Sequence, residues 1–369
     1  MEASDRLLKI TVRLVLASLI ITVMVIGKSF LVPFTWSLLI ALSSLKLIEW
    51  FEHKTKMPLG LIIFFYLIFI LVVLFGMGYF FYIELHKIFA DLPALLQKIS
   101  DRLHELSVSG GNMGIPIPDH LDKTLITKWV NEHNDFIYNF ISAFGLNIWN
   151  IILILFYLFF LLYYKDLVPQ FFTAHIKDKR HLVVVRTRVQ KSLTLTRSYI
   201  YGIMLLTLIS AAMFYLILLI FGLKYALFFG VFLGLLNLIP FVGNPIGLAV
   251  IFIFSIITKD NMFIPVMIIV ALFAVNFVQD NIIRPMIIGD KLEMNAFSVF
   301  VAIIIGGMIW GVSGMILFIP LIGIWKIFLE GNENQRNYAI FFSEIPKKPK
   351  HKSSKAAAAT VPADEEATE

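Results

Sequence analysis

Four polar residues interrupt an otherwise apolar stretch of the chain and have the spacing of one helix face. We call Asn276, Gln279, Asp280 and Arg284 the polar stripe. Polar and ionisable groups are costly at membrane depth, where they usually face a bundle interior or a watery cavity. A carboxylate there could bind a cation or a proton, and an arginine could neutralise it or meet an anionic group. The stripe therefore indicates a candidate transport pathway.

The two charges of the stripe also allow a purely local interpretation. Asp280 and Arg284 are four residues apart in the acid-first order that favours a helical ion pair. The two side chains could simply neutralise each other at a helix end. Asn281 completes the polar segment, and we expect Pro285 and Gly289 to stop the helix.

A second candidate lies upstream, in an apolar region that extends from 225 to 258 and is broken at 240–245 by prolines and glycine. Lipid cannot satisfy backbone groups freed by such a break, so the break must be buried in protein or line a wet cavity. Transporters place substrate and ion sites at broken helices, and we expect this backbone to supply ligands. A simple kink, or two short spans joined by a tight turn, is the alternative. The candidate pathway residues here are Asn237, Pro240, Gly243, Asn244 and Pro245.

Glycines mark a third unusual feature. Gly307 and Gly311 form a pair of small residues at the four-residue spacing typical of close helix contacts, and Gly230 and Gly234 form another. We expect the long apolar region 296–329 to be interrupted by its glycines and its proline. The residues expected to pack closely or to act as a hinge are Gly230, Gly234, Gly306, Gly307, Gly311, Gly314 and Pro320.

The two interrupted regions share a short sequence echo. Gly, Ile, Pro and Gly recur at the same spacing between Gly234 and Gly243 and between Gly314 and Gly323. The echo suggests a duplicated and possibly inverted half-transporter, in which the two breaks superpose under a two-fold operation.

The elements that must position these residues are membrane-spanning helices. The chain is 59% hydrophobic with a mean hydropathy of +0.85, and only 15% of its residues are charged, which excludes an ordinary soluble domain. The apolar runs are long rather than alternating, so helices rather than barrel strands are expected. The sequence predicts an all-α polytopic membrane protein with about eight transmembrane helices, some broken or re-entrant, and a helical extramembrane insert.

The chain divides into four expected parts. Residues 1–83 hold transmembrane helices 1–3, 84–146 form a helical extracytoplasmic insert, 147–330 form the transport region, and 331–369 form a disordered cytoplasmic tail. The expected spans are 10–27, 30–48, 59–83, 147–164, 198–222, 225–258, 262–283 and 296–329.

Lys and Arg gather in segments that an eight-span chain places on one side. By the positive-inside rule, both termini are then cytoplasmic in a multi-pass protein of a bacterial inner membrane. The basic connector 165–197 is interpreted as topology charge plus a surface helix on the anionic leaflet, with membrane lipids as partners rather than nucleic acid.

The chain lacks the motifs of common enzymes. It has no HExxH, no GxxxxGK loop and no GxSxG elbow, and its eight histidines have no metal-ligand spacing. We therefore expect no enzymatic activity, no metal and no cofactor. Because a nucleotide-binding domain is also lacking, active transport would draw on an ion gradient.

Three segments carry a resemblance to a known family. GLLNLIPFVGNPIG, QDNIIRPMIIGDKL followed by NAFSVFVAIIIGG, and WGVSGMILFIPLIG are similar to segments of the AI-2E family of bacterial membrane proteins, the autoinducer-2 exporter-like transporters. The resemblance covers roughly residues 5–330, including the eight-span layout. Asn244 and Asn295 stand where the family pattern suggests Pro and His.

The resemblance implies two different activities: export of a small polar signalling molecule, or exchange of Na⁺ or Li⁺ for H⁺. It also implies homo-oligomers, with a pentamer plausible. The leading hypothesis is an ion-gradient-coupled secondary transporter. A passive channel and a non-transporting oligomeric membrane scaffold are the alternatives.

Overall fold

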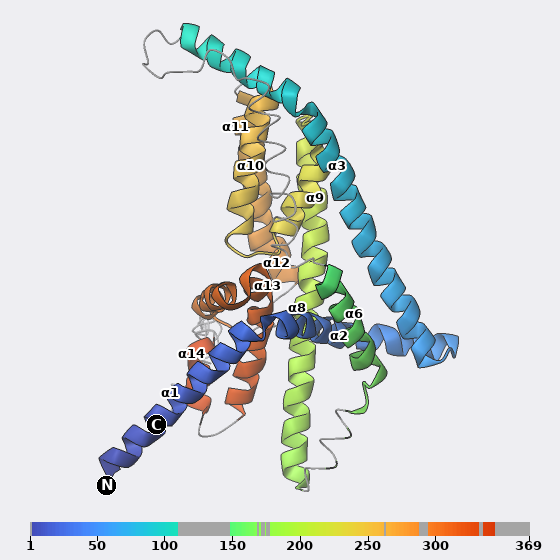
Figure 1. Cartoon of the computed structure of the whole chain (residues 1–369), viewed down its shortest axis with the longest axis vertical. Coiled ribbons are helices and arrows are strands. Elements are labelled where there is room, and N and C mark those ends of the chain that lie inside the picture. The colour runs from blue at the N-terminus through green and yellow to red at the C-terminus, as the bar shows by residue number, and fades with distance from the viewer. Residues whose placement is uncertain are drawn as a thin grey trace, which may run out of the picture.

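The computed structural model describes residues 2–109, 148–167, 170, 174, 178–261, 263–287, 294–331 and 335–343. In these ranges the regular elements are helices, joined by one isolated bridge between Met294 and Ser343 (Figure 1). Among the described residues, five helices are long and apolar enough to cross a membrane, and shorter apolar helices lie among them. The predicted all-α polytopic class is confirmed. The second part of the expected insert, most of the tail and Gly289 lie outside the described residues.

The N-terminal half contributes α1 (Glu2–Ile26), α2 (Lys28–Thr55), α3 (Leu59–Ser109) and α6 (Ile148–Tyr163). Gly27 separates the first two helices, and a Cβ there would lie 2.7 Å from the carbonyl oxygen of Val23. The structure continues α3 through the expected boundary between 83 and 84 without a break. At 1.5 Å per residue this helix is about 75 Å long, well beyond a hydrocarbon core of about 30 Å.

Helix α8 (Lys179–Ile220) is the central column of the molecule (Figure 1). It begins at Asp178, whose side chain accepts a hydrogen bond from the backbone N–H of Arg180. The basic residues 179–197, expected as a separate surface helix, instead continue without a break into the apolar part of the same helix. The chain contains no glycine or proline from 179 to 201, so nothing interrupts the helix.

The apolar region 225–258 is broken as predicted. Helices α9 (Ala226–Leu236) and α10 (Gly243–Thr258) have 11 and 16 residues. Both are shorter than the roughly 20 residues that a straight crossing needs, so together they form a hairpin. The chain continues through α11 (Phe263–Val278), the π-helix η1 (Gln279–Ile283) and the short α12 (Arg284–Ile287).

The last apolar region is also a bent unit, comprising α13 (Ala296–Glu330) and then α14 (Arg336–Phe342). The backbone of α13 breaks at Gly311, whose φ of 61° and ψ of −142° are outside the helical region. The two arms touch through Gly306 and Gly314, because a Cβ on Gly314 would lie 1.9 Å from the carbonyl oxygen of Gly306. The closest glycine contact therefore joins Gly306 to Gly314 rather than Gly307 to Gly311.

The sequence echo does not mark equivalent positions in the structure. Pro240 lies in the turn between α9 and α10, whereas Pro320 is buried inside the second helical arm of α13. The break of α13 falls nine residues before Pro320, at Gly311. The two prolines therefore occupy different local structures, and the duplication stays a prediction.

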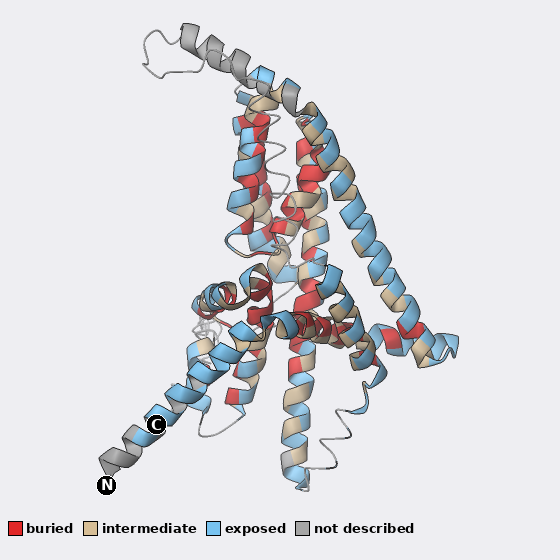
Figure 2. Cartoon of the chain, in the orientation of Figure 1, coloured by how far each residue is buried: buried red, intermediate tan, exposed pale blue. Residues whose placement is uncertain are grey.

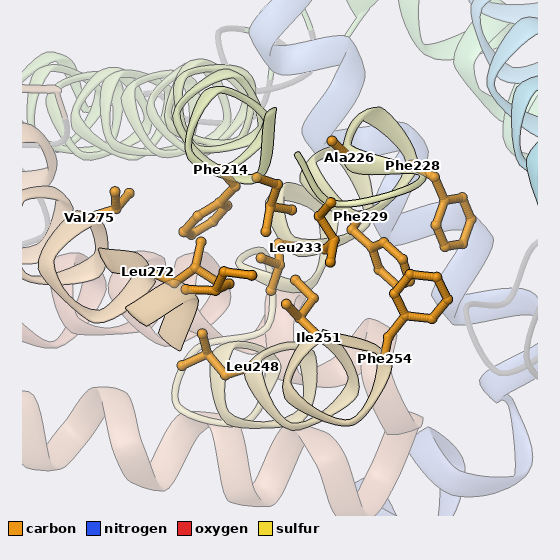
Figure 3. Packing of buried hydrophobic residues seen from close by; sticks show 13 residues of the cluster. Phe214, Ala226, Phe228, Phe229, Leu233, Leu248, Ile251, Phe254, Leu272 and Val275 are labelled. Carbon is orange, nitrogen blue, oxygen red and sulfur yellow. The ribbon is translucent and has the colours of Figure 1, made fainter. Parts of the chain in front are cut away.

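Buried apolar side chains form clusters between the helices. The largest lies among α8, α9, α10 and α11, where Phe214, Leu233, Ile251 and Leu272 meet (Figure 3). A second joins α2, α8 and α13, and a third joins α2, α3 and α6. Large stretches of α1 and α3 are exposed (Figure 2).

Candidate functional site

Five neutral polar side chains meet where the α9–α10 hairpin lies against α8 and η1. We call them the amide cluster, and they come from separate elements: one from α8, one from the end of α9, one from the start of α10, one from α11 and one from η1. The members are Ser210, Asn237, Asn244, Asn276 and Gln279.

Hydrogen bonds connect the five side chains in a continuous network. Gln279 Oε1 accepts from Ser210 Oγ at 2.8 Å and from Asn237 Nδ2 at 3.1 Å. Asn237 Nδ2 also donates to Ser210 Oγ at 2.9 Å. Asn244 Nδ2 extends the network toward the surface by donating to Asn237 Oδ1 at 3.3 Å and to Asn276 Oδ1 at 3.0 Å.

The cluster has a closed end and an open end. Ser210, Gln279 and Asn237 are buried, with 0%, 1% and 7% of their surfaces exposed, and Asn244 and Asn276 are half-buried. Two buried atoms of the cluster have no hydrogen-bond partner among the described residues: Gln279 Nε2, a donor, and Asn244 Oδ1, an acceptor. Because unpaired buried polar groups are costly, these atoms are available to a small molecule that offers both an acceptor and a donor.

The turn between α9 and α10 positions two of the amides. Phe241 has a positive φ of 65°, which is uncommon for a residue other than glycine. Gly243 is required next, because a Cβ there would lie 1.7 Å from the carbonyl oxygen of Leu236. This sharp reversal brings Asn237 and Asn244, seven residues apart in sequence, within hydrogen-bond distance of each other.

The backbone of the break is largely occupied by its own hydrogen bonds. The carbonyl oxygens of Ile239, Pro240 and Val242 accept from backbone N–H groups at 3.0, 2.8 and 3.4 Å. Pro245 lies in the first turn of α10, where its missing N–H costs little. Three carbonyls of the break are thus engaged, and Asn244 Oδ1 is a side-chain acceptor beside them that has no partner among the described residues.

The polar stripe is divided between two environments. Asn276 and Gln279 face the cluster, whereas the Asp280 and Arg284 side chains are 51% and 38% exposed and form an ion pair with an Nη2–Oδ1 distance of 3.2 Å. Adjacent residues point about 100° apart around a helix, so Gln279 and Asp280 can meet different surroundings. The structure brings together the amides of the stripe but not its charges.

The end of this helix also differs from expectation. The helix does not stop at Pro285, because η1 widens the preceding turn and α12 continues to Ile287. The N–H of Arg284 donates to the carbonyl of Gln279, five residues earlier. The backbone hydrogen bonds have therefore changed from the α-helical to the π-helical spacing before Pro285 is reached. Asn281 is exposed and, among the described residues, donates to the carbonyl of Phe277 at 2.8 Å.

Ser210 is the member of the cluster that the sequence did not single out. It lies completely buried in α8 and donates to a residue 69 positions away. Its signal was weak but present, since Thr207 and Ser210 are isolated hydroxyls within an otherwise apolar run of the helix.

Gly230 and Gly234, one of the two predicted glycine pairs, both lie against α8. A Cβ on Gly230 would be 2.7 Å from the Cα of Tyr215, and one on Gly234 would be 2.6 Å from the Cβ of Ala211. These close approaches hold α9 next to the helix that carries Ser210. Gly307, in contrast, faces the flexible side chain of Met315, at 2.9 Å from its Cε.

An all-α membrane protein with broken helical units and a polar cluster buried at one break has the architecture of a membrane transport protein. The chain belongs to the AI-2E family of transporters, whose sequence profile matches residues 14–333.

Similar proteins are themselves named as transport proteins. A protein of Haemophilus influenzae is 24% identical over 87% of this chain and 92% of its own length. YrrI of Bacillus subtilis is 31% identical, and the AI-2 transport protein TqsA of Escherichia coli is 28% identical. The aligned part covers 36% of each of these two relatives, and 36% and 34% of this chain.

Proposed function

We propose that this protein is an ion-gradient-coupled secondary transporter of a bacterial inner membrane that exports a small, uncharged polar molecule. The observation that carries the proposal is the amide cluster. Its five side chains are neutral, they come from separate helical elements, and they leave a donor and an acceptor unpaired among the described residues.

The chemistry of the cluster selects the class of substrate. Amides and a hydroxyl can donate to and accept from hydroxyl or carbonyl groups, but they offer no net charge to balance an ion. A molecule with several hydroxyl groups could bind Gln279 Nε2 through an oxygen and Asn244 Oδ1 through an O–H. One relative carries the name AI-2 transport protein, so AI-2 is a reasonable first substrate to test.

The movement that carries the substrate is proposed to involve the α9–α10 hairpin and the broken helix α13. Phe241, in the turn of the α9–α10 hairpin, packs its ring edge-on against Phe300 of α13, with centroids 5.9 Å apart. The glycine contact between the arms of α13 permits small sliding motions because no side chain separates the backbones. Substrate binding at the amide cluster could thus be transmitted to α13.

Orientation and assembly complete the proposal. The Lys and Arg distribution supports cytoplasmic positions for both termini. The apolar side chains exposed along α1 need lipid or another subunit to cover them, which supports a homo-oligomer. The family resemblance favours a pentamer.

Exchange of Na⁺ or Li⁺ for H⁺ is the second candidate, and the Asp280 carboxylate carries it. This group is the ionisable member of the polar stripe that could take up a cation or a proton, and it lies one residue from the cluster. Its exposure and its bond to Arg284 make a substrate role at the cluster better supported than a cation role here.

Reconstituted proteoliposomes distinguish these functions. Efflux of labelled AI-2 and of a panel of neutral polyols should be measured under imposed proton and sodium gradients, beside fluorescence assays of Na⁺, Li⁺ and H⁺ exchange. The proposal expects saturable efflux of a neutral solute that accelerates with a gradient. Efflux that never saturates and ignores gradients would indicate a channel, cation exchange alone would favour the antiporter, and no flux at all would favour a scaffold.

A further inference from the structure

A cavity of about 560 Å³ lies between the basic half of α8 and the second arm of α13. It is separate from the amide cluster, which lies further along α8. Gly323 allows α8 and α13 to approach closely beside the cavity, since a Cβ on Gly323 would lie 3.1 Å from the Leu195 side chain. A volume of this size suits a small ligand or the headgroup of a lipid.

The charged residues of the cavity wall give it a positive character. Arg186 and Lys191 come from α8, and Lys326 and Glu330 come from α13. Three bases and one acid leave a net charge of +2. Lys326 is only 3% exposed, and its Nζ lies 3.3 Å from Glu330 Oε1. The cavity wall therefore contains a buried ammonium group that is paired with a carboxylate.

The cavity lies where α8 changes from basic to apolar sequence, so we infer that it is at a membrane boundary. It adjoins residues 186–195, immediately before the apolar part of α8 that begins near 198, and it reaches the last turns of α13. Leu195 and Ile327 provide an apolar side to the same wall. Basic cavities between transmembrane helices at the cytoplasmic boundary are suited to phospholipid headgroups, whose charge the inner leaflet supplies.

We propose that this cavity binds a phosphate group, and that the phosphate is that of an anionic phospholipid headgroup. Arg186 and Lys191 meet the phosphate oxygens from the open side, and Lys326 approaches them from the floor. Arginine offers a planar pair of donors that matches phosphate oxygens, and lysine adds point charge. A headgroup held here joins α8, which carries Ser210, to α13, which carries the glycine contact. The inference does not depend on which solute is transported.

The test is native mass spectrometry of the purified full chain, titrated with phosphatidylglycerol and with phosphatidylcholine of the same acyl chains. The informative variant is Arg186→Gln with Lys191→Gln, because both side chains are exposed and their replacement leaves the fold intact. The matched control is Lys179→Gln with Arg180→Gln, which removes the same charge from the same helix outside the cavity. Circular dichroism melting verifies that all variants fold.

The cavity site predicts preferential binding of phosphatidylglycerol. A basic residue near an anionic lipid contributes about fivefold in affinity, so the double variant should bind about 30-fold more weakly, whereas the control should change by less than about threefold. Glu330→Gln should tighten binding by about fivefold, since it removes the negative charge of the cavity wall. Equal binding of the two lipids, or equal losses in the two double variants, would overturn the proposal.

Soluble glycerol phosphate separates the two sources of phosphate. Competition by glycerol phosphate that displaces the lipid supports the phosphate chemistry. Binding of glycerol phosphate with no preference for phosphatidylglycerol would overturn the assignment to a lipid headgroup.

Discussion

Two neighbouring parts of one helix illustrate how differently polar residues can be used in this protein. Gln279 belongs to the neutral and mostly buried amide cluster, where its side chain accepts hydrogen bonds from Ser210 and Asn237 on other helices. The ion pair of Asp280 and Arg284 begins at the next residue, yet it is charged, half-exposed and local to its own helix. A position in the sequence thus says little about which of the two environments a side chain enters.

The difference has a physical cause in desolvation. A neutral amide can be buried for the cost of satisfying its hydrogen bonds, whereas a charge needs a partner and loses much more hydration energy. The protein accordingly buries the amides in the interior of the bundle and leaves the charged pair half-exposed. A binding site made from the interior group should favour neutral solutes.

The largest expected effect comes from Gly243→Ala, which attacks the turn that positions the cluster. The added Cβ would lie 1.7 Å from the carbonyl oxygen of Leu236, so Asn237 and Asn244 would be displaced from each other. Thermal and denaturant unfolding should show a loss of about 3 kcal/mol, and solute efflux should fall by more than about tenfold. The ion pair lies outside this turn and should be unaffected.

Gly78→Ala is the matched control, because nothing lies within 4 Å of a Cβ at Gly78 on α3. An alanine there should be neutral or stabilising by up to about 1 kcal/mol. Equal behaviour of the two variants would mean that the turn does not organise the cluster.

Gln279→Leu tests the interior side of the comparison directly. It removes the acceptor of two buried bonds, from Ser210 and from Asn237. We expect unfolding to become easier by about 1–3 kcal/mol and transport of a neutral solute to fall by about fivefold to 100-fold. Asn281→Leu is the control in the same π-helix, since the Asn281 amide is exposed and donates to the carbonyl of Phe277 in its own helix. The stability of this variant should stay within about 0.5 kcal/mol of that of the parent protein. Normal transport by Gln279→Leu would exclude the cluster as the substrate site.

Asp280→Asn tests the exterior side. An exposed ion pair contributes about 0–1 kcal/mol, so stability should change little, and neutral-solute efflux should stay within about twofold of the parent value. The same proteoliposomes should be assayed for Na⁺ and Li⁺ exchange. Loss of cation exchange in a variant that folds normally would reverse the assignment, making the ion pair the functional part and the cluster a structural one.

The smallest effect is expected at a second exposed ion pair, between Lys224 in the loop before α9 and Asp91 on α3. The hydrogen bond from Lys224 to the Asp91 carboxylate raises the pKa of the lysine. The contribution of this ion pair to the free energy of unfolding is therefore complete below the ordinary lysine pKa of about 10.4. It is lost as the pH rises through the raised pKa of Lys224 in the folded protein. The melting temperature of the parent protein and that of Lys224→Gln should differ slightly and constantly from pH 6 to 9, and should converge at strongly alkaline pH. A difference that varied within the neutral range would point to another titrating partner.

Much of the architecture could be predicted because the membrane imposes simple rules on composition. Long apolar runs predicted the helices, and Pro240 with Gly243 predicted the break between α9 and α10. The position of the break in α13 was less certain because Gly306, Gly307, Gly311 and Gly314 all permit one. Only the positive φ of Gly311 shows where the chain turns.

By itself, the sequence determined that the chain is an all-α membrane protein and that its unusual polar residues lie near 237–244 and 276–284. Apolar length, glycine and proline act locally, so they can be recognised along the chain. The tertiary structure alone decided that Gln279 turns inward to Ser210 and Asn237 while Asp280 remains outside. Helical spacing fixes the angle between side chains around one axis, but the neighbour that each one meets comes from helices 42 to 69 residues away.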